Sequence, residues 1–466
     1  MTTYSAVRTT GIYCRPGCGA RPRADNVTTF ELAAAAEAAG YRACLKCRPY
    51  RVAGPVSAGA PELVCRAVQL IIAGALDEST ESVLGQRLGV SPRHLRRLFN
   101  DHLGVTPTQL AHSRRAHFAR RLLDDSDLSI AQVAFASGFG SIRHFNRAMS
   151  DVFRSSPRAL RERRRRTDRL VADGGLTLRM PFNPPFNWDA TLRRLAQRAV
   201  PGVESVVHGT YRRTITVDGA PGVLEVESGG VDHLLLRAHL PYWEGLIHIV
   251  ERAAHMLGVD TDVDAGEQQL ARDPMLAAIL RQQTGLRVPG AWAPFEIGVQ
   301  AIIDQTLDPE SSRKALEAIV RAHGTDVPGL ENGLTHTFPS PETLAGATLA
   351  TRQLSRSTAR AVGEFAAAVA TKAVQLDGTA GFEQLAASIV AVRGVDVNTA
   401  YQIALHLGHH DAFPGTDRRV QRAIEALGSS AESAADLSER WRPWRALAAT
   451  HLIAHAEAIE SKTLRN

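Results

Sequence analysis

Four of the five cysteines in this 466-residue chain stand among its first 47 residues, and no other feature constrains the fold as strongly. They form two close pairs, Cys14-x3-Cys18 and Cys44-x2-Cys47, separated by 25 residues. Two thiol pairs at this spacing can converge on one tetrahedral Zn²⁺. Basic residues flank both pairs, in the strings TTGIYCRPGC and RACLKCRP. The sequence therefore predicts a four-cysteine zinc module. Because zinc holds cysteines as thiolates, the nucleophilic form, the site can be a structural support or a reagent.

The net charge of +6 is distributed unevenly along the chain. Residues 1–169 contain 27 Lys+Arg and 14 Asp+Glu, a balance of +13, and the remaining residues contain 27 and 34, a balance of −7. A basic front half favours a polyanionic partner, most simply nucleic acid. No apolar run approaches the ~20 residues of a membrane span, and no signal sequence is recognisable. We therefore expect a protein of the reducing cytoplasm with no membrane partner.

Two helix-turn-helix patterns follow the cysteine module. In ESVLGQRLGVSPRHLRRLF, Gly89 marks the turn and Ser91 caps the second helix. In DLSIAQVAFASGFGSIRHFNRAMSDVF, Ser129 caps the first helix and Gly138 marks the turn. The second helix of each pattern is predicted to expose basic residues, namely Arg93, Arg96 and Arg97, then Arg143, His144 and Arg147. Apolar residues at helical spacing are predicted to be core, namely Phe135, Phe139, Phe145, Met149 and Phe153.

The pattern of apolar and polar residues changes after a basic run, residues 158–169, and the string Asp173-Gly-Gly. This run is predicted to be a linker that is either a solvated hinge or a segment tracking phosphates. The strings GLTLRMPF, TYRRTITV, GVLEVES and HLLLRAHL then alternate apolar and polar residues, as half-buried antiparallel strands do. From Trp243 onward the pattern is helical and punctuated by Gly and Pro. These patterns predict a multidomain α+β protein.

The cysteine region, between about Tyr4 and Pro49, closely resembles the methyl-acceptor module of the Ada family of alkylation-response regulators. The resemblance is carried by VRTTGIYCRPGCGARP, NVTTF and AAGYRACLKCRP. It implies that Cys14 accepts a methyl group from a methylated DNA phosphate, and that Cys18, Cys44 and Cys47 complete the ligand set of one Zn²⁺. A methyl phosphotriester is uncharged, so a thiolate can approach it without phosphate repulsion. Conversion of the thiolate to a thioether would change the charge of the site by +1 and strengthen its attraction to DNA.

Residues from about Pro61 to Arg165 resemble the DNA-binding domain of AraC-type regulators, on the strength of the two helix-turn-helix patterns and GFGSIRHFNRAMSDVFRSSPRALR. The resemblance implies that each second helix enters a successive major groove of promoter DNA. The implied contact residues are Arg93, His94, Arg96 and Arg97 on one helix and Ser141, Arg143, His144 and Arg147 on the other. It also makes RNA polymerase an expected partner and the nucleoid the expected location.

Residues from about Leu176 to Glu457 resemble AlkA-type helix-hairpin-helix DNA-3-methyladenine glycosylases. The resemblance is carried by NPPFNWDATLRRLAQRAVPGVE, PFEIGVQAIIDQT, AVRGVDVNTAYQIALHLGHHDAFPGTDRRVQRA and ERWRPWRALAATHLIAHAE. It implies hydrolysis of the N-glycosidic bond of an alkylated purine flipped out of the duplex. Asp417 stands at the family's carboxylate position, where it would stabilise the developing oxocarbenium ion. Asp411, the nearby competitor, is expected to be structural.

Several positions depart from the glycosylase pattern. The hairpin that grips a DNA phosphate reads Gly394-Val395-Asp396, and Asp396, in place of a glycine, is expected to take a positive φ. The positions of the base-stacking aromatics carry Asn398, Gln402, Ile453 and Ala454, and Tyr401 is a candidate substitute. Stacking is worth about 1–3 kcal/mol per base, so its loss matters. Thr306 stands where a bulky wedge residue is expected.

We therefore predict four segments: a zinc methyl-acceptor module (1–52), an all-α double helix-turn-helix domain (60–165), a small antiparallel sheet domain (174–288) and a helix-hairpin-helix glycosylase bundle (289–466). The leading hypothesis is a DNA alkylation-response protein that accepts methyl groups, regulates transcription and excises alkylated purines. The alternative is a zinc-containing transcription regulator with a degenerate, non-catalytic glycosylase-like domain.

Overall fold

The computed structural model describes residues 3–20, 22–51, 60–170, 175–261, 263–349, 352–428 and 433–463. Most of the loose stretch at residues 51–61, and residues 173 and 174 of the predicted linker, lie outside these ranges. The chain divides into two compact units. The first comprises Met1–Pro184, Leu224–Ala254 and Val259–Asp262, and the second comprises Pro185–Val223, His255–Gly258 and Val263–Asn466. Within the described ranges, every helix is too short or too polar to cross a membrane.

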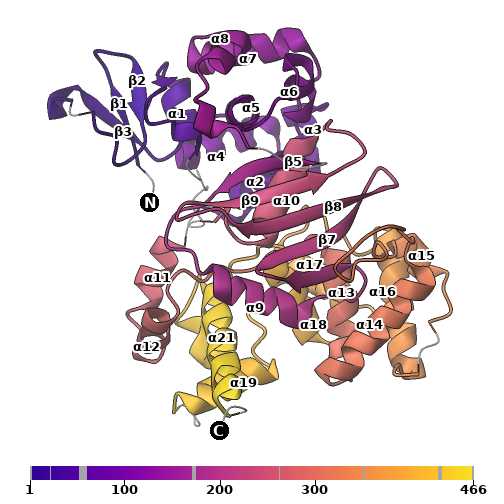
Figure 1. Ribbon diagram of the computed structural model, residues 1–466. Helices are drawn as coiled ribbons and strands as arrows, with labels where there is room; N and C mark the ends of the chain where they lie inside the picture. The colour runs from indigo at the N-terminus through magenta and orange to yellow at the C-terminus, as the bar shows by residue number, and fades with distance from the viewer. Residues whose placement is uncertain are drawn as a thin grey trace. The chain divides into compact units, whose positions relative to one another are not determined.

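The N-terminal region is a four-stranded sheet with the order β3-β1-β2-β4 (Figure 1). Its elements are β1 Tyr4–Val7, β2 Ile12–Cys14, β3 Val27–Phe30, α1 Ala33–Ala38 and β4 Arg42–Ala43, with short 3-10 turns at Ala24–Asn26 and Pro49–Arg51. β1 pairs antiparallel with both β2 and β3, whereas β2 pairs parallel with β4, so that Tyr13 lies opposite Ala43. This parallel pairing brings Cys14, the last residue of β2, and Cys44, the residue after β4, to the same end of the two strands.

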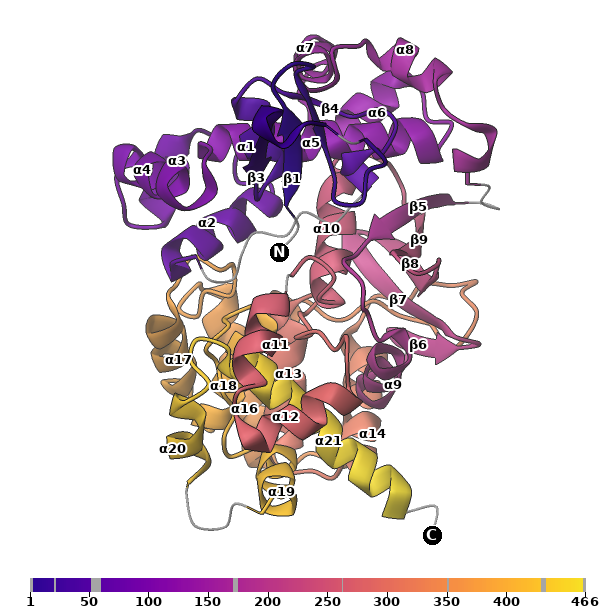
Figure 2. The same ribbon diagram turned by 90° about the vertical axis from the view of Figure 1, so that its left-hand side faces the viewer.

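Seven helices follow, and they include both predicted helix-turn-helix pairs. They are α2 Glu62–Ile72, α3 Glu81–Arg87, α4 Pro92–Leu103, α5 Pro107–Asp125, α6 Ile130–Ala136, α7 Ile142–Phe153 and α8 Pro157–Glu162, followed by a 3-10 turn at Arg166–Asp168. The long helix α5 packs against α1 (Figure 2). Leu32 and Ala35 belong to the same hydrophobic core as Leu84 and Phe99, so the cysteine region and the first helix pair share one core.

The predicted antiparallel strands are confirmed and form a second sheet with the order β5-β9-β8-β7-β6. Its strands are β5 Leu176–Pro181, β6 Glu204–Val207, β7 Thr210–Val217, β8 Ala220–Ser228 and β9 His233–His239, and α9 Trp188–Arg198 lies between β5 and β6 in sequence. Leu178 pairs with Leu236 across β5 and β9, and both are buried. The boundary between the two compact units passes through β8, at Leu224.

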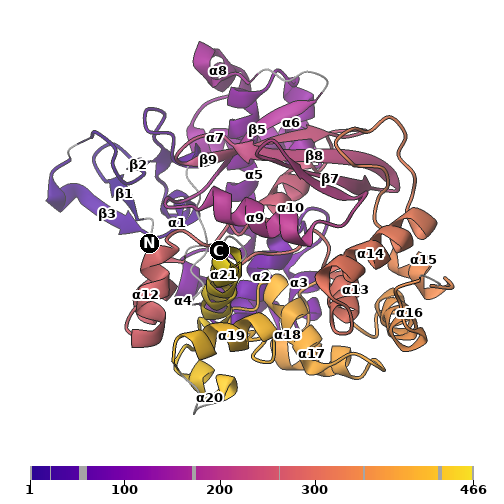
Figure 3. The same cartoon turned by 60° about the horizontal axis from the view of Figure 1, so that its bottom comes forward.

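The rest of the chain is helical, as predicted. The helices are α10 Leu246–Met256, α11 Asp264–Leu270, α12 Pro274–Gln282, α13 Pro294–Asp304, α14 Pro309–His323, α15 Pro341–Ala345, α16 Arg356–Ala370, α17 Phe382–Val390, α18 Val397–His406, α19 Arg418–Ala426, α20 Ala434–Glu439 and α21 Arg445–Thr463. In the second unit α18 packs against α13 and α17, and α19 lies beside α21 (Figure 3). The fold class is therefore multidomain α+β.

Candidate functional site

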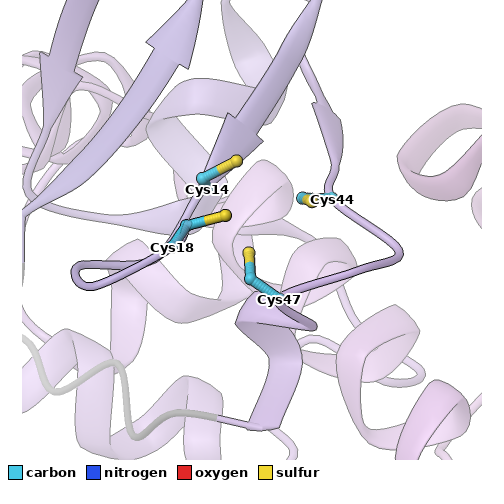
Figure 4. A group of neighbouring side chains, drawn as sticks. All are labelled: Cys14, Cys18, Cys44 and Cys47. Atoms are coloured by element: carbon cyan, nitrogen blue, oxygen red, sulfur yellow. The ribbon is translucent and has the colours of Figure 1, made fainter. Parts of the chain in front are cut away.

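The four predicted cysteine ligands converge on one point. Cys14 ends β2, Cys18 lies in the loop that follows, and Cys44 and Cys47 follow β4. Their four sulfurs lie within 4.8 Å of one another and point toward a common centre (Figure 4). A tetrahedral zinc site with Zn–S bonds of about 2.3 Å requires sulfurs about 3.8 Å apart, so only small movements separate this cluster from that geometry.

The acid–base chemistry of the cluster also fits a divalent cation. Burial, followed by the charges of Cys47 and Cys44, raises the pKa of the Cys14 thiol far above its usual range. Burial likewise raises the pKa of Cys47 to about 12. Burial also raises the pKa of Cys44, but hydrogen bonds from Cys47 and Lys46 outweigh it and lower that pKa overall. Cys14 and Cys47 therefore resist ionisation beside a neighbouring thiolate, and a bound Zn²⁺ would remove that penalty. The donor set therefore fits one Zn²⁺ held by four cysteines, as predicted.

Residues just after Cys47 connect the module to α5 and to the 3-10 turn at Arg166–Asp168. The Tyr50 hydroxyl donates to Asp124 Oδ2 at 2.8 Å, and Arg51 Nη2 lies 3.3 Å from the same oxygen. Arg48 Nη1 donates to Asp168 Oδ2 at 2.6 Å. Asp124 is 0% exposed and Asp168 5% exposed. Part of the predicted linker is therefore packed against the rest of the unit. Its first residues belong to α8, and Asp168 is buried against Arg48, the residue that follows the zinc ligand Cys47.

Glu37 forms a second connection between the cysteine region and α5. The hydroxyl of Tyr13, the neighbour of Cys14, donates to Glu37 Oε1 at 2.5 Å, and His117 Nε2 of α5 lies 2.6 Å from the same oxygen. Cys14 itself is 7% exposed, whereas Cys18, Cys44 and Cys47 are partly exposed. Tyr13, the residue before Cys14, is therefore linked through Glu37 to the helix that joins the two helix-turn-helix pairs.

Both helix-turn-helix pairs have the predicted turns and caps. Gly89 and Gly138 have φ of +71° and +75°, a backbone conformation that glycine adopts without strain. Ser91 accepts a hydrogen bond from the His94 amide at the start of α4, and Ser141 does the same for His144 at the start of α7, each at 3.2 Å. Arg93 and Arg143, in the first turns of α4 and α7, are both exposed.

The predicted DNA-contact residues all have accessible side chains. The arginines are exposed, as is His144, whereas His94 and Ser141 are partly buried; the set is Arg93, His94, Arg96, Arg97, Ser141, Arg143, His144 and Arg147. Two are held by neighbours, because Arg96 pairs with Glu81 and Arg97 Nη2 lies 3.0 Å from His94 Nδ1. One core prediction was wrong. Phe135 is 38% exposed, since it lies on the face of α6 that does not pack into the domain.

Asp417 is buried at the start of α19, within the second unit. Its Oδ1 accepts from the Arg419 amide at 2.8 Å and therefore caps the helix, while Oδ2 accepts from Arg419 Nη2 at 2.9 Å and from Gln402 Nε2 at 3.1 Å. Burial raises the pKa of the carboxyl group, but the hydrogen bonds and charge of Arg419 outweigh that effect and hold the pKa below its usual range. Asp417 is thus an anion at neutral pH.

A small cavity adjoins Asp417. Its volume is about 20 Å³, room for about one water molecule. No phenylalanine, tyrosine or tryptophan side chain lines it. The lining residues are Arg194, Arg198, Gln402, Leu405, His406, Pro414, Asp417, Arg419, Thr450, Ile453 and Glu457. Two of the predicted pocket positions, Gln402 and Ile453, are present in this lining, and Asn398 and Ala454 are not.

The other residues singled out by the glycosylase resemblance are Tyr401, Thr306 and Asp411, and each contacts a neighbouring side chain. Tyr401 stacks on Phe382, with ring centroids 5.5 Å apart, and does not line the cavity. The Thr306 hydroxyl lies 3.1 Å from that of Thr358. Asp411 pairs with Arg445 at 2.8 Å and with Arg442, the structural role that the sequence suggested.

The expectation for the hairpin is corrected at one residue. Gly394 has φ of +84°, but Asp396 has φ of −90° and ψ of 169°. Asp396 is extended because it caps α18, where its side chain accepts from the Thr399 amide at 2.7 Å. The same carboxylate accepts from Gln305 Nε2 at 3.1 Å. The second hairpin position is therefore satisfied by side-chain capping and needs no left-handed backbone.

Sequence reasoning missed the three arginines of the cavity. Arg194 and Arg198 are four residues apart on α9, so their spacing places them on one helix face, a pattern that was present in TLRRLAQR. Nothing local links that helix to Arg419, more than 200 residues away. His406 was also missed; its Nε2 lies 2.6 Å from Arg198 Nη1.

Comparisons with known proteins agree with this layout. The domain family described as the metal binding domain of Ada matches residues 2–50, a helix-turn-helix domain family matches residues 84–163, and the AlkA N-terminal domain family matches residues 177–293. A structure of 3-methyladenine DNA-glycosylase from Archaeoglobus fulgidus, 20% identical, aligns with a TM-score of 0.53 over 60% of this chain and 98% of that one, which supports the fold of the C-terminal half.

Two curated relatives cover different lengths of the chain. DNA-3-methyladenine glycosylase 2 of Escherichia coli (strain K12) is 25% identical over 58% of this chain and 94% of its own length. The bifunctional transcriptional activator/DNA repair enzyme AlkA of Mycobacterium tuberculosis (strain ATCC 25618 / H37Rv) is 35% identical over 459 residues, covering 96% of this chain and 91% of the relative. The chain therefore belongs to the family of bifunctional transcriptional activator/DNA repair enzymes, in which an Ada-type regulator is fused to an AlkA-type DNA glycosylase.

Proposed function

We propose that this protein senses methylated DNA through Cys14, regulates transcription through its paired helix-turn-helices, and removes alkylated purines of the 3-methyladenine type from DNA. The observation that carries the sensor role is the four-sulfur cluster with Cys14 at the end of β2. DNA is the partner throughout, as duplex with methylated phosphates, alkylated bases and promoter sites. We propose RNA polymerase as the protein partner and the cytoplasm, on the nucleoid, as the place of action.

In the sensor, the Cys14 sulfur attacks the methyl carbon of a phosphotriester. An S–C bond forms, the O–C bond breaks, and the phosphate leaves as a diester anion. When bound, Zn²⁺ keeps the sulfurs ionised at neutral pH. The thiolate becomes an uncharged thioether, so the site gains +1 and attracts the DNA backbone more strongly. Since Cys14 is 7% exposed, the DNA must bring the methyl group to a narrow approach.

The sensor is tested by intact-mass analysis after incubation with methylated duplex. Wild type is expected to gain one methyl group, which peptide mapping assigns to Cys14. Cys14→Ser should gain none, and Cys65→Ser, outside the cluster, should behave as wild type. A methyl group found on Cys18 or Cys47 instead would assign the acceptor role to one of the more exposed sulfurs.

For base excision, the buried anion Asp417 supports electrostatic stabilisation of an oxocarbenium-like transition state. The carboxylate, held below its usual pKa, stays charged as the N-glycosidic bond breaks, and water then adds to C1′. Release of 3-methyladenine from treated duplex should fall by orders of magnitude in Asp417→Asn, which preserves a side-chain acceptor for the cap.

A second candidate, binding without excision, is favoured by one observation: Asp417 is paired with Arg419 beside a cavity of about 20 Å³. The base-release assay separates the two functions. If wild type and Asp417→Asn both release no base while still binding alkylated duplex, the C-terminal domain is a binding module and the protein is a zinc-containing regulator.

A further inference from the structure

The second helices of the two helix-turn-helix pairs repeat one sequence pattern. Residues 91–107 and 141–157 align without a gap at a spacing of 50 residues. Six positions of this alignment are identical, namely Ser91 and Ser141, Arg93 and Arg143, His94 and His144, Arg97 and Arg147, Asp101 and Asp151, and Pro107 and Pro157. Three of these six pairs are basic side chains already expected to contact DNA. The repeat therefore includes the residues that would read the bases.

The structure gives both copies the same backbone frame. α4 and α7 each contain 12 residues, begin directly after their serine cap and end at a residue with a left-handed backbone. Ser91 accepts a hydrogen bond from the His94 amide, and Ser141 accepts one from the His144 amide, each at 3.2 Å. Because a position counted from the cap fixes the direction of a side chain around the helix axis, equivalent residues of the two helices point in equivalent directions.

The arginine in the first turn of each helix is available to a ligand. Arg93 and Arg143 are exposed, and neither forms an ion pair or hydrogen bond with another described residue. Arg97 and Arg147 follow one turn later and are exposed as well. A guanidinium group in the major groove recognises guanine through paired hydrogen bonds to O6 and N7. Identical side chains in identical frames therefore favour the same bases.

His112 of α5 lies beside the starting turns of both helices. Burial lowers the pKa of His112, and the nearby charges of His144 and Arg147 on α7 add to that effect. The same histidine lines a cavity of about 510 Å³ together with Pro92 and Arg96 of α4. The first turns of α4 and α7 therefore lie on the same side of α5. Two helices that enter the major groove from one side meet it one helical turn apart, a separation of about 10–10.5 base pairs.

Two positions near the caps differ between the copies. α4 has Pro92 and Arg96 where α7 has Ile142 and Asn146. Ile142 is 42% exposed and offers an apolar surface of the kind that contacts the methyl group of thymine. Arg96 is paired with Glu81, whereas Asn146 is exposed. The bases that face these two positions are therefore expected to differ between the two subsites.

We propose that α4 and α7 recognise the same short base pattern, so that the promoter site contains two copies of it about one helical turn apart. Each copy is expected to contain a guanine that an arginine of the repeat recognises. The inference rests on the promoter binding proposed above and names the class of DNA site that such binding requires. A single chain would thus obtain the doubled recognition that dimeric helix-turn-helix proteins obtain from two subunits.

The experiment selects binding sites from a random duplex library with the full-length, zinc-loaded protein and repeats the selection with matched variants. Wild type should enrich one base pattern twice, with centres about 10–10.5 base pairs apart. Arg93→Ala should relax one base in one copy, and Arg143→Ala should relax the same base in the other copy. Each variant should bind the wild-type site about tenfold more weakly or worse, since one bidentate base contact is lost. Arg158→Ala is the control and should relax no base, because Arg158 is exposed on α8, outside both second helices.

The outcomes separate the repeated site from promoter binding itself. Enrichment of two unrelated patterns, with Arg93→Ala and Arg143→Ala relaxing different bases, would overturn the repeat while sequence-specific binding stands. Enrichment of no sequence by wild type would refute the proposed regulation and the repeat with it.

A phosphate contact by the arginines is decided by the histidine pair. If both arginine variants lower the slope of log affinity against log salt concentration and relax no base, both arginines contact phosphates. His94→Ala and His144→Ala should then relax one common base, in different copies of the pattern. Relaxation of different bases, or of none, by the two histidine variants would overturn the proposal.

Discussion

Replacing Asp124 by alanine should destabilise the first compact unit and loosen the zinc module from α5. The carboxylate is 0% exposed and is surrounded by donors: Tyr50 at 2.8 Å, Arg120 at 2.5 Å, Arg51 at 3.3 Å and Arg48 at 3.7 Å. Removing one partner from a buried ion pair leaves an uncompensated charge and costs about 3–5 kcal/mol. Arg48 and Arg51 keep Asp168 as a partner when Asp124 is removed, so the loss is expected anywhere within that range.

The matched control is Asp151→Ala. Arg147 and Asp151 have the same i, i+4 spacing as Arg120 and Asp124, but they lie 4.0 Å apart with side chains 83% and 68% exposed. An exposed pair of this kind contributes about 0–1 kcal/mol. The two variants thus differ in burial and in the number of donors, and both remove one carboxylate from a helix that also carries its arginine.

The assay is thermal unfolding of the full chain, with zinc release to a chelator recorded in parallel. At about 2–4 °C per kcal/mol for a unit of this size, Asp124→Ala should lower the melting temperature by roughly 6–20 °C. It should also speed zinc loss, because Arg48 directly follows the ligand Cys47. If Asp124→Ala melts and loses zinc like Asp151→Ala, the buried network is not what joins the module to α5.

Three further outcomes are expected. His248 Nε2 lies 2.5 Å from Asp77 Oδ2; burial lowers the pKa of His248, but Asp77 outweighs it and raises the pKa overall. A pKa raised by folding contributes stability that is present below the unfolded pKa of about 6.5 and is lost as the pH rises through the folded pKa. His248→Gln should therefore reduce the melting temperature more at about pH 6 than at about pH 9. An equal reduction at both pH values would contradict this assignment. Cys18→Ala should abolish tight binding of zinc, measured by elemental analysis, whereas Cys65→Ser should retain one equivalent, since Cys65 lies outside the cluster. Arg143→Ala, on the exposed face of α7, should weaken promoter binding in a mobility-shift assay. If the slope of log affinity against log salt concentration falls by about one, Arg143 contacts a phosphate. If the slope is unchanged and the sequence preference relaxes, Arg143 contacts a base.

The parts of the fold that follow from short-range rules were predictable from the sequence. Cysteine spacing indicated the metal site, because two pairs of cysteines, each close in sequence, can bind one zinc ion together. Ser91 indicated its helix start and Gly89 its turn, because a cap and a left-handed glycine act within a few residues. Alternation of apolar residues indicated the second sheet for the same reason.

The two wrong predictions, for Asp396 and Phe135, have different causes. Asp396 was expected to replace a glycine at positive φ, yet aspartate is among the best N-cap residues, and it precedes the helix that holds Thr399. Phe135 was assigned to the core from its spacing alone. Spacing identifies a helix face and does not say that another element covers it.

The meeting of Arg194 and Arg198 with Arg419 could not be predicted, because it depends on the tertiary fold. Arg194 precedes β6 and Arg419 follows the hairpin helix, so no window of sequence contains both. The −7 balance of the back half pointed away from a cationic pocket. Net charge describes the solvated surface as a whole, and a few desolvated side chains can set the potential of a pocket with the opposite sign.

The two roles weighed for Asp417, helix cap and catalytic carboxylate, are compatible because a carboxylate has two oxygens. Oδ1 accepts the Arg419 amide and caps α19, which fixes the orientation of the group. Oδ2 faces Gln402 and the Arg419 guanidinium at the cavity. A pKa held below its usual range suits an anion that stabilises positive charge and is unsuited to a general acid. Capping therefore fixes the orientation of Asp417, and in the excision proposed above the oxygen that would face the sugar is Oδ2, which Arg419 contacts in this structure.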